Sequence, residues 1–117
     1  MILGIGCDIV RVERVERAAK NERFLVRVYT EAERTYAVQC GRAGAASLAA
    51  RFAGKEAVLK AFGTGLRGGT LHDVEILPGA LGAPEVHLYG YFAARAAEMG
   101  VTRIWITLSH EKEYATA

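Results

Sequence analysis

The sequence has 117 residues, of which 51% are hydrophobic and 24% charged, and its formal net charge is +2 at pH 7. This balance is typical of one folded soluble domain spanning residues 1–117, at a size where an oligomer interface often adds stability. It excludes a disordered chain, and no apolar run approaches the roughly 20 residues that span a bilayer. The charge is too small for a general nucleic-acid-binding protein. Because the N-terminus carries no secretory pattern, we expect a cytoplasmic protein.

The first half of the chain is predicted to be mostly helical after one strand. Residues 2–10 are rich in Ile, Leu and Val and are interrupted by Gly4 and Gly6, which is typical of a buried strand that another backbone approaches closely. A short helix over residues 12–19 carries arginines opposite its apolar face. Apolar spacing continues through residues 24–29, and Thr30 then begins a capping box with Glu33. We expect the helix after Thr30 to run to about residue 39.

A long helix is expected from about Ser47 to Phe62, followed directly by Gly63 as the residue that ends it. Residues 74–77 and 85–89 alternate like strands around a turn-rich segment, which indicates a hairpin. Residues 91–99 have helical composition, and residues 103–108 read as a strand that reaches Ser109 and His110. The predicted fold class is therefore α+β, with an antiparallel sheet packed against the long helix.

Two carboxylates are candidate metal ligands. Asp8 is the only charge within residues 2–10, and an acid near the end of a buried strand is costly unless it pairs with a cation, accepts hydrogen bonds or binds a metal. Glu56 precedes Lys60 by four residues, so spacing alone favours an exposed ion pair worth about 0.2–0.5 kcal/mol. If Asp8 and Glu56 meet, their hard oxygen atoms suit Mg²⁺, with water and substrate phosphates completing its coordination.

The long helix also carries lysines and a glycine-rich exit that are typical of a phosphate site. Lys55 falls among the apolar positions, where its ammonium could reach water or could lie beside a phosphate. Gly63, Thr64 and Gly65 could simply end the helix, although the amides of such a loop also bind phosphate oxygens. Lys55 and Lys60 would then supply point charges. The sequence has no Gly-x-x-x-x-Gly-Lys-Ser/Thr pattern, so this is not a P-loop.

Other polar residues carry weaker signals. Ser109 and His110 are neighbours in sequence, which is not the geometry of a catalytic triad, so we expect capping or ligand contact. The arginines of residues 11–27 alternate with glutamates, which favours a solvated mixed-charge face over a surface that docks an acidic helix. Cys7 and Cys40 follow no zinc-binding or disulfide spacing, and we expect both to be reduced.

Together these segments resemble the holo-[acyl-carrier-protein] synthases, the small trimeric 4′-phosphopantetheinyl transferases. The resemblance covers nearly the whole chain, and the Gly-x-Asp start combined with the Lys-Glu-Ala helix is highly specific. It implies the 4′-phosphopantetheinyl transferase fold and transfer of the phosphopantetheine arm of coenzyme A to a serine of apo acyl carrier protein, releasing adenosine 3′,5′-bisphosphate in support of fatty acid biosynthesis. The matching segments, in the family's order, are Gly4-Ile5-Gly6-x-Asp8-Ile9-Val10, Phe24-x-x-Arg27-x-x-Thr30-x-x-Glu33, Arg51-Phe52-Ala53-x-Lys55-Glu56-Ala57 with Lys60 to Gly65, Gly82-x-Pro84 and Ser109-His110.

The resemblance also implies roles for individual residues. Asp8 and Glu56 match the family's Mg²⁺ ligands and, with Lys60, form the implied catalytic set. In a homotrimer, some coenzyme A contacts come from the neighbouring subunit. The positions matched to coenzyme A are Arg51, at its nucleotide end, Lys60, Gly63, Thr64, Gly65, and the interface residues Pro84, Ser109 and His110. The positions matched to the face that docks the acidic helix of the carrier protein are Arg14, Phe24 and Arg27.

Three features depart from the family pattern. Trp105 stands where many relatives have a histidine, and Gly54 replaces a more common alanine or valine. The family normally continues past residue 117 as a final strand, so this chain is either naturally short or a shortened form, which bears on the stability of the trimer. Two other functions stay open: a module that binds an acidic helix without turnover, and a Mg²⁺-dependent nucleotide hydrolase that uses the same acids.

Overall fold

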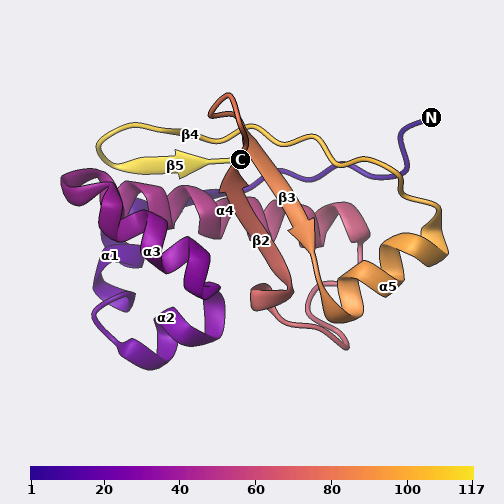
Figure 1. The fold of residues 1–117 in the computed structure, drawn as a ribbon, viewed down its shortest axis with the longest axis horizontal. Helices are drawn as coiled ribbons and strands as arrows, with labels where there is room; N and C mark the ends of the chain where they lie inside the picture. Colours follow the sequence, from indigo (N-terminus) through magenta and orange to yellow (C-terminus); the bar gives the residue numbers. More distant parts are fainter.

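The computed structural model describes all 117 residues and is organised around one central helix, α4 (Gly44–Phe62). In Figure 1, α4 crosses the middle of the molecule, with the first three helices at one end and α5 at the other. The remaining elements, in chain order, are β1 (Ile9–Arg11), α1 (Val12–Ala18), α2 (Glu22–Val28), α3 (Glu31–Gln39), β2 (Val74–Pro78), β3 (Pro84–Leu88), α5 (Gly90–Met99), β4 (Ser109–His110) and β5 (Tyr114–Thr116).

The signals that begin and end the helices are confirmed. Thr30 accepts a hydrogen bond from the Glu33 amide, and the Glu33 side chain accepts one from the Thr30 amide, which completes the capping box of α3. Gly63 ends α4 in the left-handed conformation, with φ of 78°. The long helix begins at Gly44, three residues before the expected start, because a 3₁₀ turn over Gly41–Ala43 leads directly into it.

Two small antiparallel sheets pack against α4. One has the strand order β1-β5-β4 and the other is the predicted β2–β3 hairpin, in which Ile76 lies opposite Val86. The central strand of the first sheet, β5, was not predicted from the sequence. Thr116 of β5 lies opposite Ile9 on one side and Ser109 on the other.

The predicted strands over residues 2–10 and 103–108 are wrong in extent. Both segments are extended, but only residues 9–10 of the first belong to a strand, and the second pairs only from residue 109 onward. Residues 2–7 and 103–108 lack a neighbouring strand and form no backbone–backbone hydrogen bond. The expected burial is also wrong, since residues 1–5 are exposed. The close backbone approach is confirmed: a Cβ atom at Gly4 or Gly6 would collide with a carbonyl oxygen of α4.

The core consists of two apolar clusters on opposite parts of α4. The first joins α1, the end of α2 and β5 to the beginning of α4, and it includes Val15, Tyr29, Leu48 and Ala115. The second joins the hairpin and α5 to the end of α4, and it includes Phe62, Ile76 and Phe92. Of the thirteen buried residues of α4, six are alanine or glycine, which suits a helix that is covered on most sides. No helix combines the length and the apolar character needed to cross a membrane.

Candidate active site

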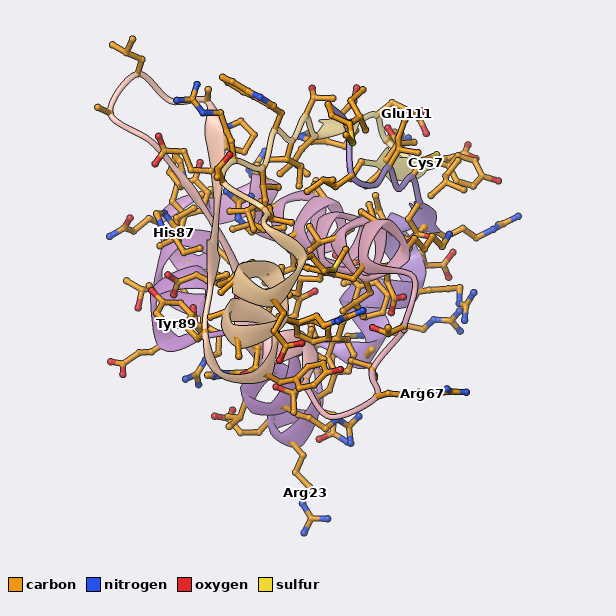
Figure 2. All side chains as sticks on the ribbon, turned by 90° about the vertical axis from the view of Figure 1, so that its right-hand side faces the viewer. Cys7, Arg23, Arg67, His87, Tyr89 and Glu111 are labelled. Carbon is orange, nitrogen blue, oxygen red and sulfur yellow. The ribbon has the colours of Figure 1, made fainter.

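Asp8 and Lys60 meet at the contact between the N-terminal segment and the last turns of α4. The Lys60 Nζ atom lies 2.9 Å from Asp8 Oδ1 and donates a second hydrogen bond to the Cys7 carbonyl at 3.0 Å. The close approach at Gly4 and Gly6 brings the segment within reach of this lysine. The hydrogen bond to Asp8 raises the pKa of Lys60, so its ammonium is charged at neutral pH. In Figure 2, the labelled Cys7 marks this part of the molecule.

Glu56 is a half-buried carboxylate on the same part of α4. Burial raises its pKa, the negative charge of Asp8 raises it further, and Lys60 partly opposes both effects. The expected surface ion pair between Glu56 and Lys60 does not form, because Lys60 pairs with Asp8 instead. The side chains of Asp8, Glu56 and Lys60 therefore form one electrostatically coupled group, which we call the carboxylate–lysine cluster.

The cluster has the donor chemistry of a magnesium site. No group of three or more His, Cys, Asp or Glu side chains gathers anywhere in the chain, so no all-protein cage for a metal exists. Asp8 and Glu56 come from separate segments, and the charge of Asp8 destabilises the ionised form of Glu56. Such a pair nevertheless suits Mg²⁺, which binds one or two carboxylates and takes its other ligands from water and phosphate. Asp8 and Glu56 are the residues that would hold it.

The loop that follows α4 contains an unsatisfied hydroxyl. Thr64 Oγ1 is the one buried side-chain polar atom without a hydrogen-bond partner. Leaving such a group unpaired costs roughly 1–3 kcal/mol, and a bound phosphate oxygen would accept a hydrogen bond from it. Gly63 and Gly65, on either side, both have positive φ angles. Figure 2 shows the labelled Arg67, slightly further along this loop, pointing away from the molecule.

Both sequence-based interpretations of Lys55 are wrong. Its side chain is completely buried, and its Nζ atom lies 2.8 Å from Glu33 Oε1 and donates to the carbonyls of Leu71 and Val74. Burial lowers the pKa of Lys55, and the Glu33 charge opposes that change. All three ammonium protons have acceptors within the fold, so none is free for a phosphate.

Glu33 is the partner that sequence reasoning missed. Besides Lys55, its carboxylate accepts hydrogen bonds from the amides of Thr30 at 2.9 Å and Ile76 at 2.8 Å. The Thr30 hydroxyl also donates to Glu75 at 2.6 Å. A capping box alone did not distinguish Glu33 from an exposed capping residue. The lysine among apolar positions of α4 was the available signal, since a buried cation requires a buried anion.

Arg51 is also engaged within the fold. It is buried, its Nε atom donates to the Ile76 carbonyl at 2.9 Å, and its Nη1 atom donates to Ser47 Oγ at 3.0 Å. Its guanidinium lies 4.6 Å from the centre of the Tyr36 ring. These contacts join α4 to β2 and α3. The contact of Arg51 with the nucleotide stays a prediction.

Three residues predicted to contact the nucleotide from a neighbouring subunit make no polar contact with the carboxylate–lysine cluster of their own chain. Pro84 begins β3, and Ser109 and His110 form β4, where both are exposed. None of the three forms a hydrogen bond or ion pair with the cluster. Within a single copy of the chain, no polar contact therefore joins these three residues to the cluster.

The predicted docking face has unpaired cations. Arg14 on α1 and Arg27 on α2 are exposed, and neither forms an ion pair; the one pair on α1 joins Arg17 to Glu13 at 4.0 Å. Phe24 on α2 is half-buried, with its ring 6.2 Å from that of Phe52 and stacked on it. Phe24 therefore anchors α2 on α4, and the arginines remain available to an acidic partner.

Residues 4–117 match the family model of the 4′-phosphopantetheinyl transferase superfamily. The chain belongs to this superfamily. It is 49% identical over 119 residues to the holo-[acyl-carrier-protein] synthase of Desulforudis audaxviator, covering 100% of this chain and 90% of that protein. The crystal structure of the holo-[acyl-carrier-protein] synthase of Neisseria meningitidis superimposes with a TM-score of 0.89 at 36% identity, covering 99% of this chain and 94% of that one.

Another relative was crystallised with a bound ligand. The holo-(acyl-carrier-protein) synthase of Bacillus anthracis, in complex with CoA (3′,5′-ADP), has a TM-score of 0.80 and 33% identity, covering 99% of this chain and 92% of that one. These matches to members of the 4′-phosphopantetheinyl transferase superfamily confirm both the resemblance and the α+β fold class predicted from the sequence.

Proposed function

We propose that this chain, as one domain over residues 1–117, transfers the phosphopantetheine arm of coenzyme A to a serine of apo acyl carrier protein. The observation that carries the proposal is the carboxylate–lysine cluster beside the unsatisfied Thr64 hydroxyl, in a chain of the 4′-phosphopantetheinyl transferase superfamily. The names of its relatives and the coenzyme A found in one of them support the substrates. The holo carrier protein would serve fatty acid biosynthesis, and a cytoplasmic location stays a prediction.

The reaction is a displacement at phosphorus. The carrier serine oxygen forms a bond to the phosphorus that bears the pantetheine arm, the bond from this phosphorus to the bridging oxygen of the pyrophosphate breaks, and the serine loses its proton. Adenosine 3′,5′-bisphosphate leaves with the bonding electron pair. Negative charge therefore accumulates on the leaving phosphate, and positively charged groups placed there lower the barrier.

Within this chain, Lys60 is the cation suited to that charge. Its ammonium is exposed and held by Asp8, so it can reach a ligand phosphate without a change of the backbone. The Thr64 hydroxyl and the loop amides around it would bind another phosphate oxygen. Bound Mg²⁺ would neutralise the pyrophosphate oxygens, and Asp8 and Glu56 would hold it.

Glu56 is the group of this chain that can take up the serine proton. Its pKa is raised by burial and by Asp8, which makes its carboxylate a stronger base than an exposed glutamate. Whether Glu56 accepts the proton itself or holds the metal while solvent takes the proton, it must be ionised. Activity is therefore expected to fall as the pH decreases through the raised pKa of Glu56.

An oligomer would complete the site. Three large apolar side chains are exposed on the outer face of the first sheet and its extended neighbours: Ile5 is 85%, Ile9 61% and Trp105 80% exposed. Such a patch on a small protein indicates an interface with another protein. A homotrimer would cover it and would supply Pro84, Ser109 and His110 of a neighbouring copy to the nucleotide.

The decisive experiment is a mass measurement on the carrier. Purified protein, coenzyme A, Mg²⁺ and apo acyl carrier protein are expected to yield a carrier heavier by one phosphopantetheine, and Asp8→Ala should abolish the product at any accessible Mg²⁺ concentration. Full activity of Asp8→Ala would exclude the metal assignment. Coenzyme A cleavage without a carrier would indicate a hydrolase, and carrier binding without any mass change would indicate a binding module.

A further inference from the structure

The loop that follows α4 lies against the beginning of α5. We call residues 63–69 the glycine loop, because four of its seven residues are glycine. In Figure 1 the loop leaves the end of α4 and passes beside the first turn of α5. That turn carries two neighbouring aromatic residues, Tyr91 and Phe92, which form the surface on which the loop packs.

The second half of the glycine loop is in direct contact with these two rings. A Cβ atom added at Gly68 would lie 2.7 Å from Tyr91 Cε2, and one added at Gly69 would lie 2.5 Å from Phe92 Cε2 and 3.0 Å from Tyr91 Cδ1. The backbone therefore approaches the rings too closely for any side chain at either position. Gly68 also has a φ angle of 80°, in the left-handed region.

The rings restrict a segment that would otherwise have great conformational freedom. Glycine loses more backbone entropy on folding than any other residue, so a loop with four glycines is costly to order. In its first half, a Cβ atom at Gly63 or Gly65 would meet nothing within 4 Å. Within the loop, the Gly69 amide donates to the Leu66 carbonyl at 3.1 Å. Contact with the aromatic rings is therefore the main restraint on the second half.

The loop is held in a conformation that leaves a buried hydroxyl unsatisfied. Thr64 Oγ1 has no hydrogen-bond partner, whereas buried polar groups in proteins are almost always paired. A loop free to rearrange would give this hydroxyl a partner. The packing at Gly68 and Gly69 opposes such a rearrangement, so the loop is ordered before a ligand arrives.

Tyr91 is the ring that can be tested without disrupting the core. Phe92 is completely buried and belongs to the second apolar cluster, with its ring 5.5 Å from that of Phe62. Tyr91 is half-buried at the margin of this cluster, and its ring meets Phe92 edge-on at 5.1 Å. The Tyr91 atoms nearest to Gly68 are ring carbons, so the contact does not depend on the hydroxyl.

We propose that Tyr91 is a positioning residue for coenzyme A, and that its ring holds the glycine loop in the conformation in which Thr64 and the loop amides bind a phosphate. The inference rests on the proposed function, which assigns a phosphate to this loop. Tyr91 acts through the loop and does not touch the ligand. Because the loop binds the substrate in the ground state as well as in the transition state, loss of the ring should change KM more than kcat.

The first test compares two substitutions of Tyr91. Tyr91→Ala removes the ring and should raise the KM for coenzyme A about tenfold, while kcat stays within about twofold of its original value. Tyr91→Phe keeps the ring and should keep the original KM. If Tyr91→Phe raises KM as much as Tyr91→Ala, the hydroxyl is the important group and the proposal fails. Tyr91→Leu, which keeps apolar volume without a ring, replaces Tyr91→Ala if the latter does not fold.

Met99→Ala is the matched control for stability. Met99 is also half-buried, packs against the same apolar cluster and lies in the last turn of α5, away from the glycine loop. Both alanine variants should lower the urea midpoint of unfolding, but only Tyr91→Ala should raise the KM. An equal rise in KM with Met99→Ala would show that general destabilisation causes the effect, and the proposal would be wrong.

A double variant tests whether Tyr91 acts through the loop. Thr64→Val removes the hydroxyl donor and should by itself raise the KM for coenzyme A about tenfold. If the Tyr91 ring serves to place this hydroxyl, Thr64→Val/Tyr91→Ala should raise KM hardly more than the larger single change. Multiplication of the two effects, to about a hundredfold, would show that the residues act independently and would overturn the proposal.

The last measurement needs no ligand. The NMR order parameters of the amides of residues 64–68 should fall from about 0.85 to below about 0.6 in Tyr91→Ala and stay unchanged in Tyr91→Phe. If the loop is equally mobile in the original protein and in Tyr91→Ala, the ring does not hold it. An original protein that transfers no phosphopantetheine would refute the proposed function, whereas an active Tyr91→Ala with an unchanged KM would refute this inference alone.

Discussion

Replacing Lys55 by methionine tests whether this lysine is structural, in contrast to Lys60 on the same helix, for which we propose a catalytic role. Methionine is similar in length and apolar, so the change removes the charge and leaves most of the packing. It leaves the Glu33 carboxylate buried without its cation, although the amides of Thr30 and Ile76 still donate to it. Removing one partner of a buried ion pair costs about 3–5 kcal/mol.

That loss is smaller than the expected stability of the domain, so the variant should fold and its stability can be measured. At about 0.05–0.15 kcal/mol per residue, a domain of this size has a free energy of unfolding of roughly 6–18 kcal/mol. With a urea m-value of about 2 kcal/mol/M, Lys55→Met should lower the midpoint of unfolding by about 2 M. The double variant Glu33→Gln/Lys55→Met should recover much of the loss, because it removes the unpaired charge as well.

The comparison with Lys60→Met decides the roles. Lys60 is exposed, so its replacement should hardly change the urea midpoint but should strongly reduce kcat/KM with coenzyme A. Lys55→Met, assayed at a temperature where it is folded, should keep the KM for coenzyme A. The reasoning fails if Lys55→Met costs less than about 1 kcal/mol, or if a stably folded Lys55→Met raises this KM as much as Lys60→Met does.

Three further predictions concern the site and its approach. Because the pKa of Glu56 is raised in the fold, the folded chain holds that proton more tightly than the unfolded chain, and stability is lost as pH rises from the ordinary pKa to the raised one. Glu56→Gln should therefore increase the Tm at pH 8. It should also abolish transfer, and Mg²⁺ should no longer raise the Tm of this variant. If Mg²⁺ still raised its Tm as it does for the original protein, the metal assignment would be contradicted. Arg14→Glu should mainly raise the carrier KM and weaken its salt dependence, and an unaltered KM would exclude α1 from docking. Gly6→Ala should lower the free energy of unfolding by about 1–3 kcal/mol and reduce activity, because the added methyl collides with the Ala57 carbonyl and moves Asp8 away from Lys60. A fully stable and active Gly6→Ala variant would show that the close approach of Gly6 to α4 is not needed.

Local sequence signals determined most of the helices and one sheet. The Thr30 capping box, Gly63 after α4 and the alternation of the hairpin act between residues close in the chain, so their consequences can be inferred without the fold. The resemblance also identified Asp8, Glu56 and Lys60 as a set, and the fold brings them into one cluster.

Tertiary structure alone decided how charges are paired and which extended segments become strands. Lys55 pairs with Glu33 across 22 positions of sequence and Lys60 pairs with Asp8 across 52, and no spacing rule reaches so far. A strand likewise requires a neighbour: residues 2–7 and 103–108 have strand composition, yet they form no backbone–backbone hydrogen bond, whereas the unpredicted β5 has a neighbour on each side. Pairing depends on what lies across the sheet, which only the folded chain specifies.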